Sequence, residues 1–138
     1  MEENRIKRYK QKISVIEQRR QNIFSWISDS DEKSVLAIYK AFQEIIESLT
    51  DLCAMIVKDA DGLVADDYSN IEQLGKQTII NQDQESLLKE ANGLRNRLVH
   101  EYNGLNRNIA LESIQQINEN LDSIMKDLSI WIKKHSIK

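Results

Sequence analysis

The chain lacks proline altogether and has only four glycines among its 138 residues. Proline and glycine are the residues that most disfavour the interior of an α-helix, so a chain almost without them can form long uninterrupted helices. Its balance of 41% hydrophobic and 30% charged residues is typical of helical proteins. We therefore expect an all-α fold, in a single domain over residues 1–138 that can bury a core without disulfides or a metal.

Apolar residues recur at three- and four-residue spacing in the first half of the chain, which predicts a long helix over residues 5–27. The apolar positions of this helix are Ile6, Tyr9, Ile13, Ile16, Ile23 or Phe24, and Ile27. Asp29 followed by Glu32 resembles a capping box, so a second helix is predicted to start there and to end near Asp59. Its strict apolar alternation favours close packing against an antiparallel partner. The stripe comprises Val35, Ile38, Phe42, Ile45, Leu49, Leu52 and Ile56.

The middle of the chain is expected to contain a loop and a short helix. Residues 59–68 lack helical periodicity and contain typical loop residues. Ser69 with Glu72 repeats the capping-box pattern, which predicts a short helix through about Thr78 and a break around Asn81.

Two more helices are expected after this break. The first has an apolar face made of Leu87, Leu88, Ala91, Leu94 and Leu98. Asn103-Gly104 marks a turn, and Asn106 or Arg107 precedes a last helix. The stripe of that helix comprises Leu111, Ile114, Ile117, Leu121, Ile124, Leu128 and Trp131. Together these elements predict an up-and-down four-helix bundle with an additional short helix. The long stripes could form either core or a dimer seam, and core is favoured for most of each stripe.

The net charge of −3 gives no general attraction to nucleic acid, so any RNA binding has to depend on a local patch. Basic residues gather within residues 5–20, and this stretch is interpreted as a solvated helix face rather than a surface that tracks phosphates. The start of the chain does not resemble a signal peptide, and no window is apolar enough to span a bilayer. We therefore expect a cytoplasmic protein without membrane association.

Several chemistries lack the residue patterns that they require. The Glu-x-x-His pairs of di-iron bundles are missing, because Arg97 and Ile132 occupy the positions that the glutamates would need. Cys53 lies at helical spacing among apolar residues and is interpreted as a packing residue, so no His/Cys set for zinc is left. Glycine-rich phosphate loops and nucleophile elbows are also absent from the sequence. We expect no metal and no cofactor, and one candidate site at residues 95–102.

Residues 95–102 combine two guanidinium groups, an imidazole and a phenol. RNA cleavage without a metal needs proton transfers, which a histidine can perform, and a cation at the phosphate, which an arginine can supply. At about 100° per residue, Arg95 and His100 lie roughly 140° apart on an ideal helix. They can reach one phosphate only if the helix breaks near His100 or if two copies of the cluster face each other. The second arrangement predicts a symmetric homodimer with its cleft on the two-fold axis.

The spacing Arg-x-x-x-x-His-x-Tyr, here Arg95, His100 and Tyr102, resembles the signature of the HEPN superfamily and in particular of its HepT-like toxins. Gly93-Leu94 before the motif and Asn96 after the arginine extend this resemblance, and the order of elements resembles the family over the whole chain. The resemblance implies a homodimeric, metal-independent endoribonuclease that acts as the toxin of a toxin–antitoxin pair. It also implies a nucleotidyltransferase-like antitoxin that silences the toxin by attaching AMP to the motif tyrosine.

Roles for the individual residues follow from the chemistry and the resemblance together. His100 is the expected general base or acid, Arg95 the phosphate clamp, and Asn96 a positioning partner. Tyr102 is the expected orienting group and modification site. Possible RNA contacts are Arg97 and Arg107, for which simple surface charge is the favoured interpretation.

Two other functions stay open on the sequence. The chain could be a noncatalytic nucleotide-binding HEPN-like subunit, or a helical adaptor that holds a partner with its apolar stripes. On spacing alone, Arg95 and Arg97 could equally be ordinary surface cations, His100 a satisfied helix-end histidine and Tyr102 a core aromatic residue.

Overall fold

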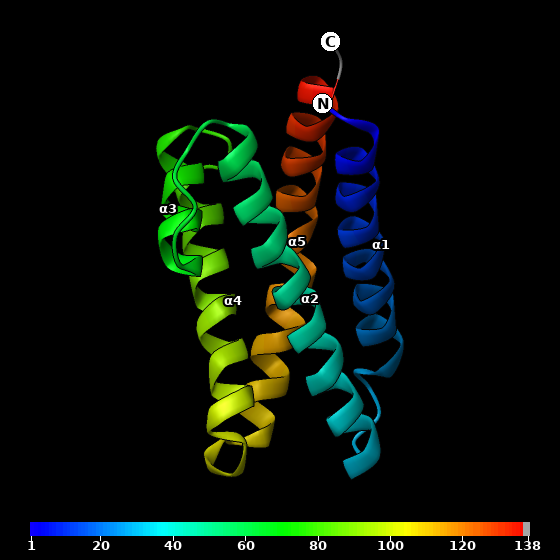
Figure 1. The fold of residues 1–138 in the computed structure, drawn as a ribbon. Coiled ribbons are helices and arrows are strands. Elements are labelled where there is room, and N and C mark those ends of the chain that lie inside the picture. Colours follow the sequence, from blue (N-terminus) through cyan, green and yellow to red (C-terminus); the bar gives the residue numbers. More distant parts are fainter. Residues whose placement is uncertain (137–138) are drawn as a thin grey trace.

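The computed structural model describes the backbone of residues 1–136 and all of their side chains except that of Tyr102. Its elements are α1 (Glu3–Trp26), α2 (Glu32–Asp59), α3 (Asp67–Lys76), α4 (Gln82–His100), the 3-10 turn η1 (Tyr102–Gly104) and α5 (Arg107–Ser136). The four long helices run alternately in opposite directions, and the short α3 lies beside α4 (Figure 1). The predicted all-α, up-and-down four-helix bundle with an additional short helix is confirmed.

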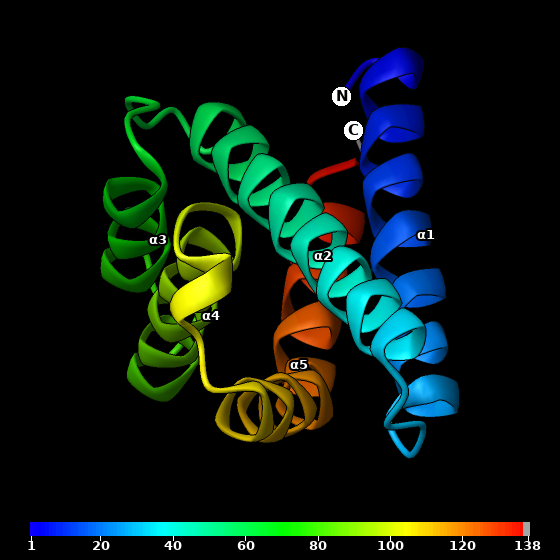
Figure 2. The same ribbon diagram turned by 90° about the horizontal axis from the view of Figure 1, so that it is seen from below.

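Helix α2 is the central element of the bundle and packs against each of the other four α-helices. Viewed from below, it lies between α1 on one side and the α3–α4 pair on the other (Figure 2). The whole of its predicted apolar stripe is buried, and Tyr39, Ile46 and Cys53 are buried on its remaining faces. All of these side chains belong to the core of the bundle. The stripe of α2 is therefore intramolecular core, and Cys53 is the packing residue that its spacing predicts.

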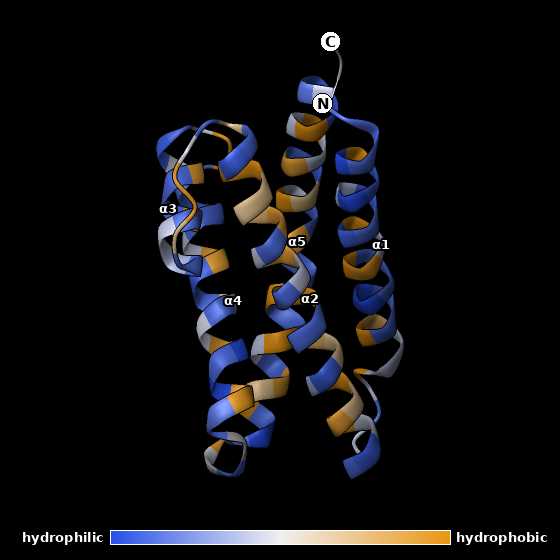
Figure 3. Ribbon diagram, in the orientation of Figure 1, coloured by the Kyte–Doolittle hydropathy of each residue, from blue (hydrophilic) through white to orange (hydrophobic). Residues whose placement is uncertain are grey.

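Helices α1 and α5 bury one stripe each. On α1 the core residues include Tyr9, Ile16 and Ile23, whereas Phe24 is 44% exposed, so Ile23 occupies the inward position. On α5 the inner part of the predicted stripe is buried, namely Ile114, Ile117, Leu121, Ile124 and Leu128. Apolar and polar segments accordingly alternate along these helices (Figure 3). None of the helices within residues 1–136 is apolar over a stretch long enough to cross a membrane.

Helix α2 does not begin with the predicted pair of Asp29 and Glu32. Its cap is Asp31, whose carboxylate accepts hydrogen bonds from the backbone N–H of Ser34 (3.1 Å) and from the Ser34 hydroxyl (2.6 Å). Asp29 instead donates its backbone N–H to the carbonyl of Trp26 (2.9 Å), in the turn that closes α1. The predicted cap residue is wrong because Asp29 takes part in the turn that ends α1.

The predicted start of α3 is wrong for a similar reason. Asp66 caps this helix by accepting the backbone N–H of Ser69 (2.8 Å), so Ser69 is a donor in the first turn and not the cap. Glu72 reaches across to Lys89 of α4 (2.9 Å) and does not bond back to the start of its own helix. An earlier start gives α3 two residues, Asp67 and Tyr68, that the sequence interpretation placed in the loop.

The remaining helix starts lie where the breaks are predicted. Asn81 and Gln84 form a reciprocal capping box at the start of α4, each side chain accepting the backbone N–H of the other residue at 2.8 Å. Asn106 accepts the backbone N–H of Ile109 (3.1 Å) and so begins α5. These caps satisfy backbone donors that have no partner within the helix.

The loop between α2 and α3 folds back along α3 and is fixed to it (Figure 1). The side chain of Asn70 both accepts from the backbone N–H of Ala65 (2.8 Å) and donates to the carbonyl of the same residue (3.1 Å). Gln73 donates to the carbonyl of Leu63 (2.7 Å). These bonds fix the loop that leads into α3, and α3 is in turn packed against both α2 and α4.

The basic stretch of residues 5–20 is only partly a solvated face. Lys7, Arg8 and Lys10 are exposed, in agreement with that interpretation. The remaining basic residues of the stretch form ion pairs with carboxylates of neighbouring helices. These pairs are Arg5–Asp59, Lys12–Asp51, Arg19–Glu44 and Arg20–Asp122. Arg20 is only 3% exposed, so for this residue the expectation of a solvated position is wrong.

Candidate active site

The candidate residues lie on the last turns of α4, at the end of the bundle opposite the two termini (Figure 1). Helix α4 ends at His100, where the backbone N–H of Glu101 still donates to the carbonyl of Arg97 (2.7 Å). Because the helix continues regularly as far as His100, the helical offset of roughly 140° between Arg95 and His100 is retained. The break after His100 comes too late in the sequence to bring the two side chains together.

Arg95 points toward α3 and is largely buried, with 18% of its side chain exposed. Its Nη2 donates to Oδ1 of Asn92 on α4 (2.8 Å) and to Oδ2 of Asp67 at the start of α3 (3.2 Å). Its Nε is buried and has no hydrogen-bond partner within the described part of the chain. A buried N–H without an acceptor is costly, and such groups are uncommon in folded proteins. The guanidinium is therefore fixed at one end and incompletely satisfied at the other.

Asp67 is a contact that the sequence interpretation missed. It belongs to a run of aspartates that looks like an ordinary acidic loop, and it lies 28 positions before Arg95. The only signal in the sequence was that this run is acidic whereas the candidate site at residues 95–102 contains two arginines. Its pairing with Arg95 depends on the antiparallel packing of α3 against α4, which no local pattern encodes.

The packing of α3 against α4 is close and polar. Lys89 of α4 bonds to Glu72 of α3 (2.9 Å) and to Glu85 on its own helix (3.2 Å). Farther along, the Tyr68 hydroxyl lies 3.5 Å from the point where a Cβ on Gly93 would be. A Cβ at position 93 would make an ordinary van der Waals contact with this hydroxyl, so α3 and α4 approach each other closely at this point.

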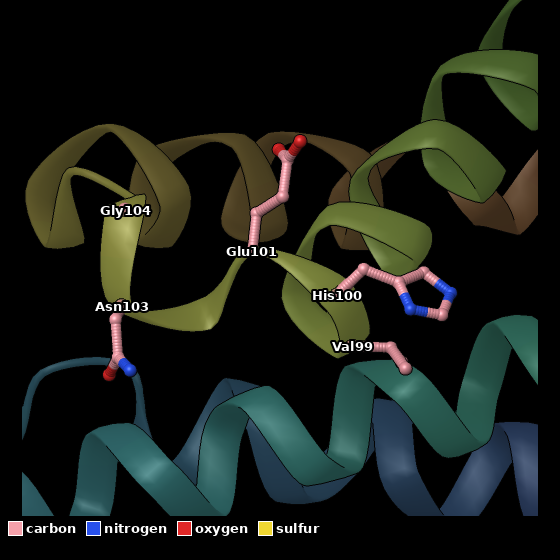
Figure 4. A pocket seen from close by; sticks show the side chains of 5 residues that line it. All are labelled: Val99, His100, Glu101, Asn103 and Gly104. Atoms are coloured by element: carbon pink, nitrogen blue, oxygen red, sulfur yellow. The ribbon is translucent and has the colours of Figure 1, made fainter.

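His100 is exposed and lies in an open depression at the end of α4, which is lined by Val99, His100, Glu101, Asn103 and Gly104. In Figure 4 the imidazole and the side chain of Val99 project to the same side, whereas Glu101 and Asn103 project in two other directions. The imidazole forms no hydrogen bond or ion pair with the described side chains, and the residue is exposed to solvent. Arg95 does not line this depression.

The other predicted residues surround these two. Asn96 is half-buried and, four residues before His100, lies on the same face of α4. Arg97 and Arg107 are exposed, and neither forms an ion pair with a described residue. Tyr102 begins η1, directly after the depression-lining Glu101, but its side chain lies outside the described part of the structure. Within residues 1–136, no group of three or more His, Cys, Asp or Glu side chains is arranged to hold a metal ion.

Comparison with known proteins identifies the family of this chain. The family model described as "Ribonuclease HepT-like" matches residues 6–128. Two proteins of Archaeoglobus fulgidus that carry the name "Putative RNase" are similar in sequence. One is 34% identical over 115 residues, which cover 83% of this chain and 86% of the relative. The other is 47% identical over 72 residues, and this match spans 52% of the chain and only about half, 54%, of the relative.

Solved structures show the same fold at low sequence identity. A tri-AMPylated HEPN toxin of Shewanella oneidensis, in complex with an MNT antitoxin, superposes with a TM-score of 0.82 at 21% identity, over 94% of this chain and 99% of the toxin. A toxin–antitoxin structure with AMP-PNP gives a TM-score of 0.80 at 20% identity, over 93% of this chain and 99% of the matched one. Since the family model spans nearly all of the described helices, this chain belongs to the HepT-like ribonuclease family.

Proposed function

We propose that this protein is an endoribonuclease that acts as the toxin of a toxin–antitoxin pair. The observation that carries the proposal is an arginine and an accessible histidine at the motif positions of a chain that belongs to the HepT-like family. The exposed His100 can be reached by a large substrate such as RNA, and the partly buried Arg95 is a fixed cation nearby on the same helix. Both features suit a phosphodiester substrate.

The proposed reaction needs no metal ion. A base accepts the proton of the ribose 2′-hydroxyl while the 2′-oxygen attacks the adjacent phosphorus. A protonated acid supplies a proton to the departing 5′-oxygen. His100 is the base or the acid of this step, and Arg95 stabilises the negative charge that builds up on the phosphate oxygens. Asn96, on the face of His100, positions the substrate by hydrogen bonds. Arg97 and Arg107 provide exposed positive charge for the RNA backbone.

The active form in this proposal is a homodimer. Within one chain Arg95 is turned toward α3, whereas His100 opens to solvent in a depression that Arg95 does not line. Two copies related by a two-fold axis can place the arginine of one beside the histidine of the other. Val99, which is 52% exposed next to His100, supplies apolar surface for such a contact.

We further propose that a nucleotidyltransferase-like antitoxin silences the enzyme by attaching AMP to Tyr102. The similar Shewanella oneidensis toxin is tri-AMPylated and in complex with an MNT antitoxin. Tyr102 follows His100 by two residues and lies in sequence between Glu101 and Asn103, which both line the depression. A nucleotide attached there would occupy the space of the substrate and add negative charge where the RNA phosphate has to bind.

The decisive experiment measures RNA cleavage by the purified protein in the presence of a chelator. His100→Ala should abolish both cleavage and growth arrest in cells. His135→Ala is the matched control, because this other histidine stacks on Trp131 near the far end of α5 and should be dispensable. A His100→Ala protein that still cuts RNA would disprove the mechanism. A wild-type protein that binds nucleotide but leaves RNA intact would favour the noncatalytic subunit.

The modification is tested separately by mass spectrometry. The chain is produced alone and together with the proposed nucleotidyltransferase-like antitoxin, and peptides containing Tyr102 are examined for added AMP. Co-production should add AMP to the wild-type peptide and suppress nuclease activity, whereas Tyr102→Phe should stay unmodified and escape suppression. Suppression of Tyr102→Phe to the wild-type extent would show that the antitoxin acts in another way.

A further inference from the structure

Arg95 is held by a second element of the bundle, and that element has no role in the function proposed so far. Nη2 of Arg95 donates both to Asn92 on α4 and to Asp67 in the first turn of α3. We propose that Asp67 is a positioning residue, which fixes the guanidinium of Arg95 in the orientation used on the RNA phosphate. This inference rests on the proposed nuclease function and extends its active site to α3.

The ion pair can orient Arg95 and stay intact when a phosphate binds to the arginine. Both bonds of Arg95 leave from Nη2, and neither of them uses Nη1 or Nε. Because the guanidinium is planar, two acceptors on one nitrogen determine the direction of the other N–H groups. Because Nε is shielded from solvent, Nη1 is the nitrogen that can donate to a phosphate oxygen while Nη2 keeps its bond to Asp67. Such prior orientation removes part of the entropy that a long, flexible side chain would lose on binding.

The buried Nε supports the same interpretation. It is shielded from solvent and has no acceptor among the described residues, although the guanidinium around it is well fixed. A freely moving arginine side chain could turn to hydrate this N–H, so its burial without a partner supports a side chain that is restrained, in part by the bonds at Nη2. Asp67 supplies the acceptor on the neighbouring helix, whereas Asn92 lies on α4 together with Arg95.

Asp67 itself is firmly located. It is the first residue of α3, directly after the cap Asp66, and the preceding loop is fixed by Asn70 and Gln73. A carboxylate in the first turn of a helix is favoured by the partial positive charge of the helix start. With 40% of its side chain exposed, Asp67 lies at the boundary with solvent, so the ion pair is next to a surface that a nucleic acid can approach.

The test compares three variants in steady-state cleavage of a short oligoribonucleotide. Asp67→Ala should lower kcat/KM by about tenfold or more, mainly through kcat, because a misaligned arginine stabilises the transition state poorly. Asp67→Asn should stay within about threefold of wild type, because its amide oxygen still accepts the bond from Nη2. Glu72→Ala is the matched control, since it removes the other ion pair between α3 and α4 without touching Arg95.

Two outcomes would overturn the proposal. If Asp67→Ala keeps the wild-type kcat, the carboxylate does not position Arg95. If Asp67→Ala and Asp67→Asn both lower KM and cut faster, Asp67 competes with the phosphate for the arginine and does not orient it. A loss as large in Glu72→Ala as in Asp67→Ala would assign the effect to the placing of α3 in general and would equally contradict a specific role.

A second measurement does not depend on nuclease activity. The Nε–H signals of arginine side chains are followed by NMR, with Arg95→Lys to assign the signal of Arg95. We expect slow hydrogen exchange for Arg95 in wild type and in Asp67→Asn, and fast exchange in Asp67→Ala. The buried Arg20, whose Nε donates to Asn118, is an internal reference that should not change. Unchanged exchange at Arg95 in Asp67→Ala would contradict the positioning, whereas a protein that shows the expected change but cuts no RNA would contradict only the nuclease function.

Discussion

The thiol of Cys53 is enclosed by the core, with 1% of the residue exposed. Burial, and to a smaller extent the nearby charge of Asp67, raises the pKa of Cys53 to about 12. We predict that a thiol reagent at pH 8 will not label the native protein at an appreciable rate but will label it rapidly in denaturant. Because the thiolate is the reactive form, fast labelling of the native chain would show that α2 is less firmly packed than described.

Arg20 shows where residue-level prediction fails. It lies in a basic stretch and looks like a solvated cation, yet it is 3% exposed between α1 and α5. Its Nε donates to Oδ1 of Asn118 (3.1 Å), Nη2 to the Asn118 carbonyl (2.7 Å) and Nη1 to Asp122 (2.7 Å). These acceptors are about a hundred positions away in the sequence. Arg20 can be buried only because the packing of α5 against α1 provides them, and the local sequence does not show this packing.

We predict that Asn118→Ala will destabilise the fold by about 1–3 kcal/mol, because it leaves a buried guanidinium N–H without its acceptor. Urea unfolding followed by circular dichroism measures this change. Asn120→Ala is the control, as Asn120 is exposed and its amide donates to the carbonyl of Gln116 one turn earlier on the same helix. Equal stabilities of the two variants would mean that the bond to Arg20 contributes little.

At the scale of the elements, the helices themselves were predictable and their first residues were not. The apolar stripes of α1, α2 and α5 follow from periodicity, because burial of one helix face is a repeated local pattern. The caps of α2 and α3 are Asp31 and Asp66, each close to another residue that could serve as well. Which candidate becomes the cap depends on how the preceding segment is held, and the sequence does not display that.

The cap of α3 gives a prediction about pH. Hydrogen bonds from the backbone N–H and the hydroxyl of Ser69 lower the pKa of Asp66 below its ordinary value of 3.8. The carboxylate therefore stabilises the folded state above pH 3.8, and this contribution is lost as the pH falls through the lower pKa of the folded protein. The Tm of Asp66→Asn should lie below that of wild type at pH 7, and the difference should close in strong acid. A difference that does not change with pH would exclude this charged cap.

At the scale of the molecule, the bundle could be predicted but its arrangement around α2 could not. Four long stripes indicate four long helices, yet only the structure shows that α2 contacts all the others and has its stripe inside the core. The candidate residues on α4 follow from their spacing, whereas Asp67 reaches Arg95 only through the packing of α3. Arg95 and His100 face different surroundings within one chain, which is why the proposed function brings them together in a homodimer.

A shared cleft makes a quantitative prediction about mixed dimers. If Arg95 of one subunit works beside His100 of the other, a dimer of one Arg95→Ala subunit and one His100→Ala subunit has both changes in one site and an intact second site. Each variant alone should be inactive. Equal amounts, unfolded and refolded together, should recover about a quarter of wild-type cleavage, because about half of the dimers are mixed and each has one working site of two.

The control is wild type refolded with an equal amount of the double variant Arg95→Ala/His100→Ala. In a shared cleft its mixed dimers have no intact site, so they should add nothing to the activity of the wild-type dimers that form beside them. If each site instead takes both residues from one subunit, the two predictions reverse. The mixture of single variants would then stay inactive, while wild type mixed with the double variant would keep one working site in every mixed dimer. The experiment therefore decides, from rates alone, whether one site takes its arginine and its histidine from different subunits.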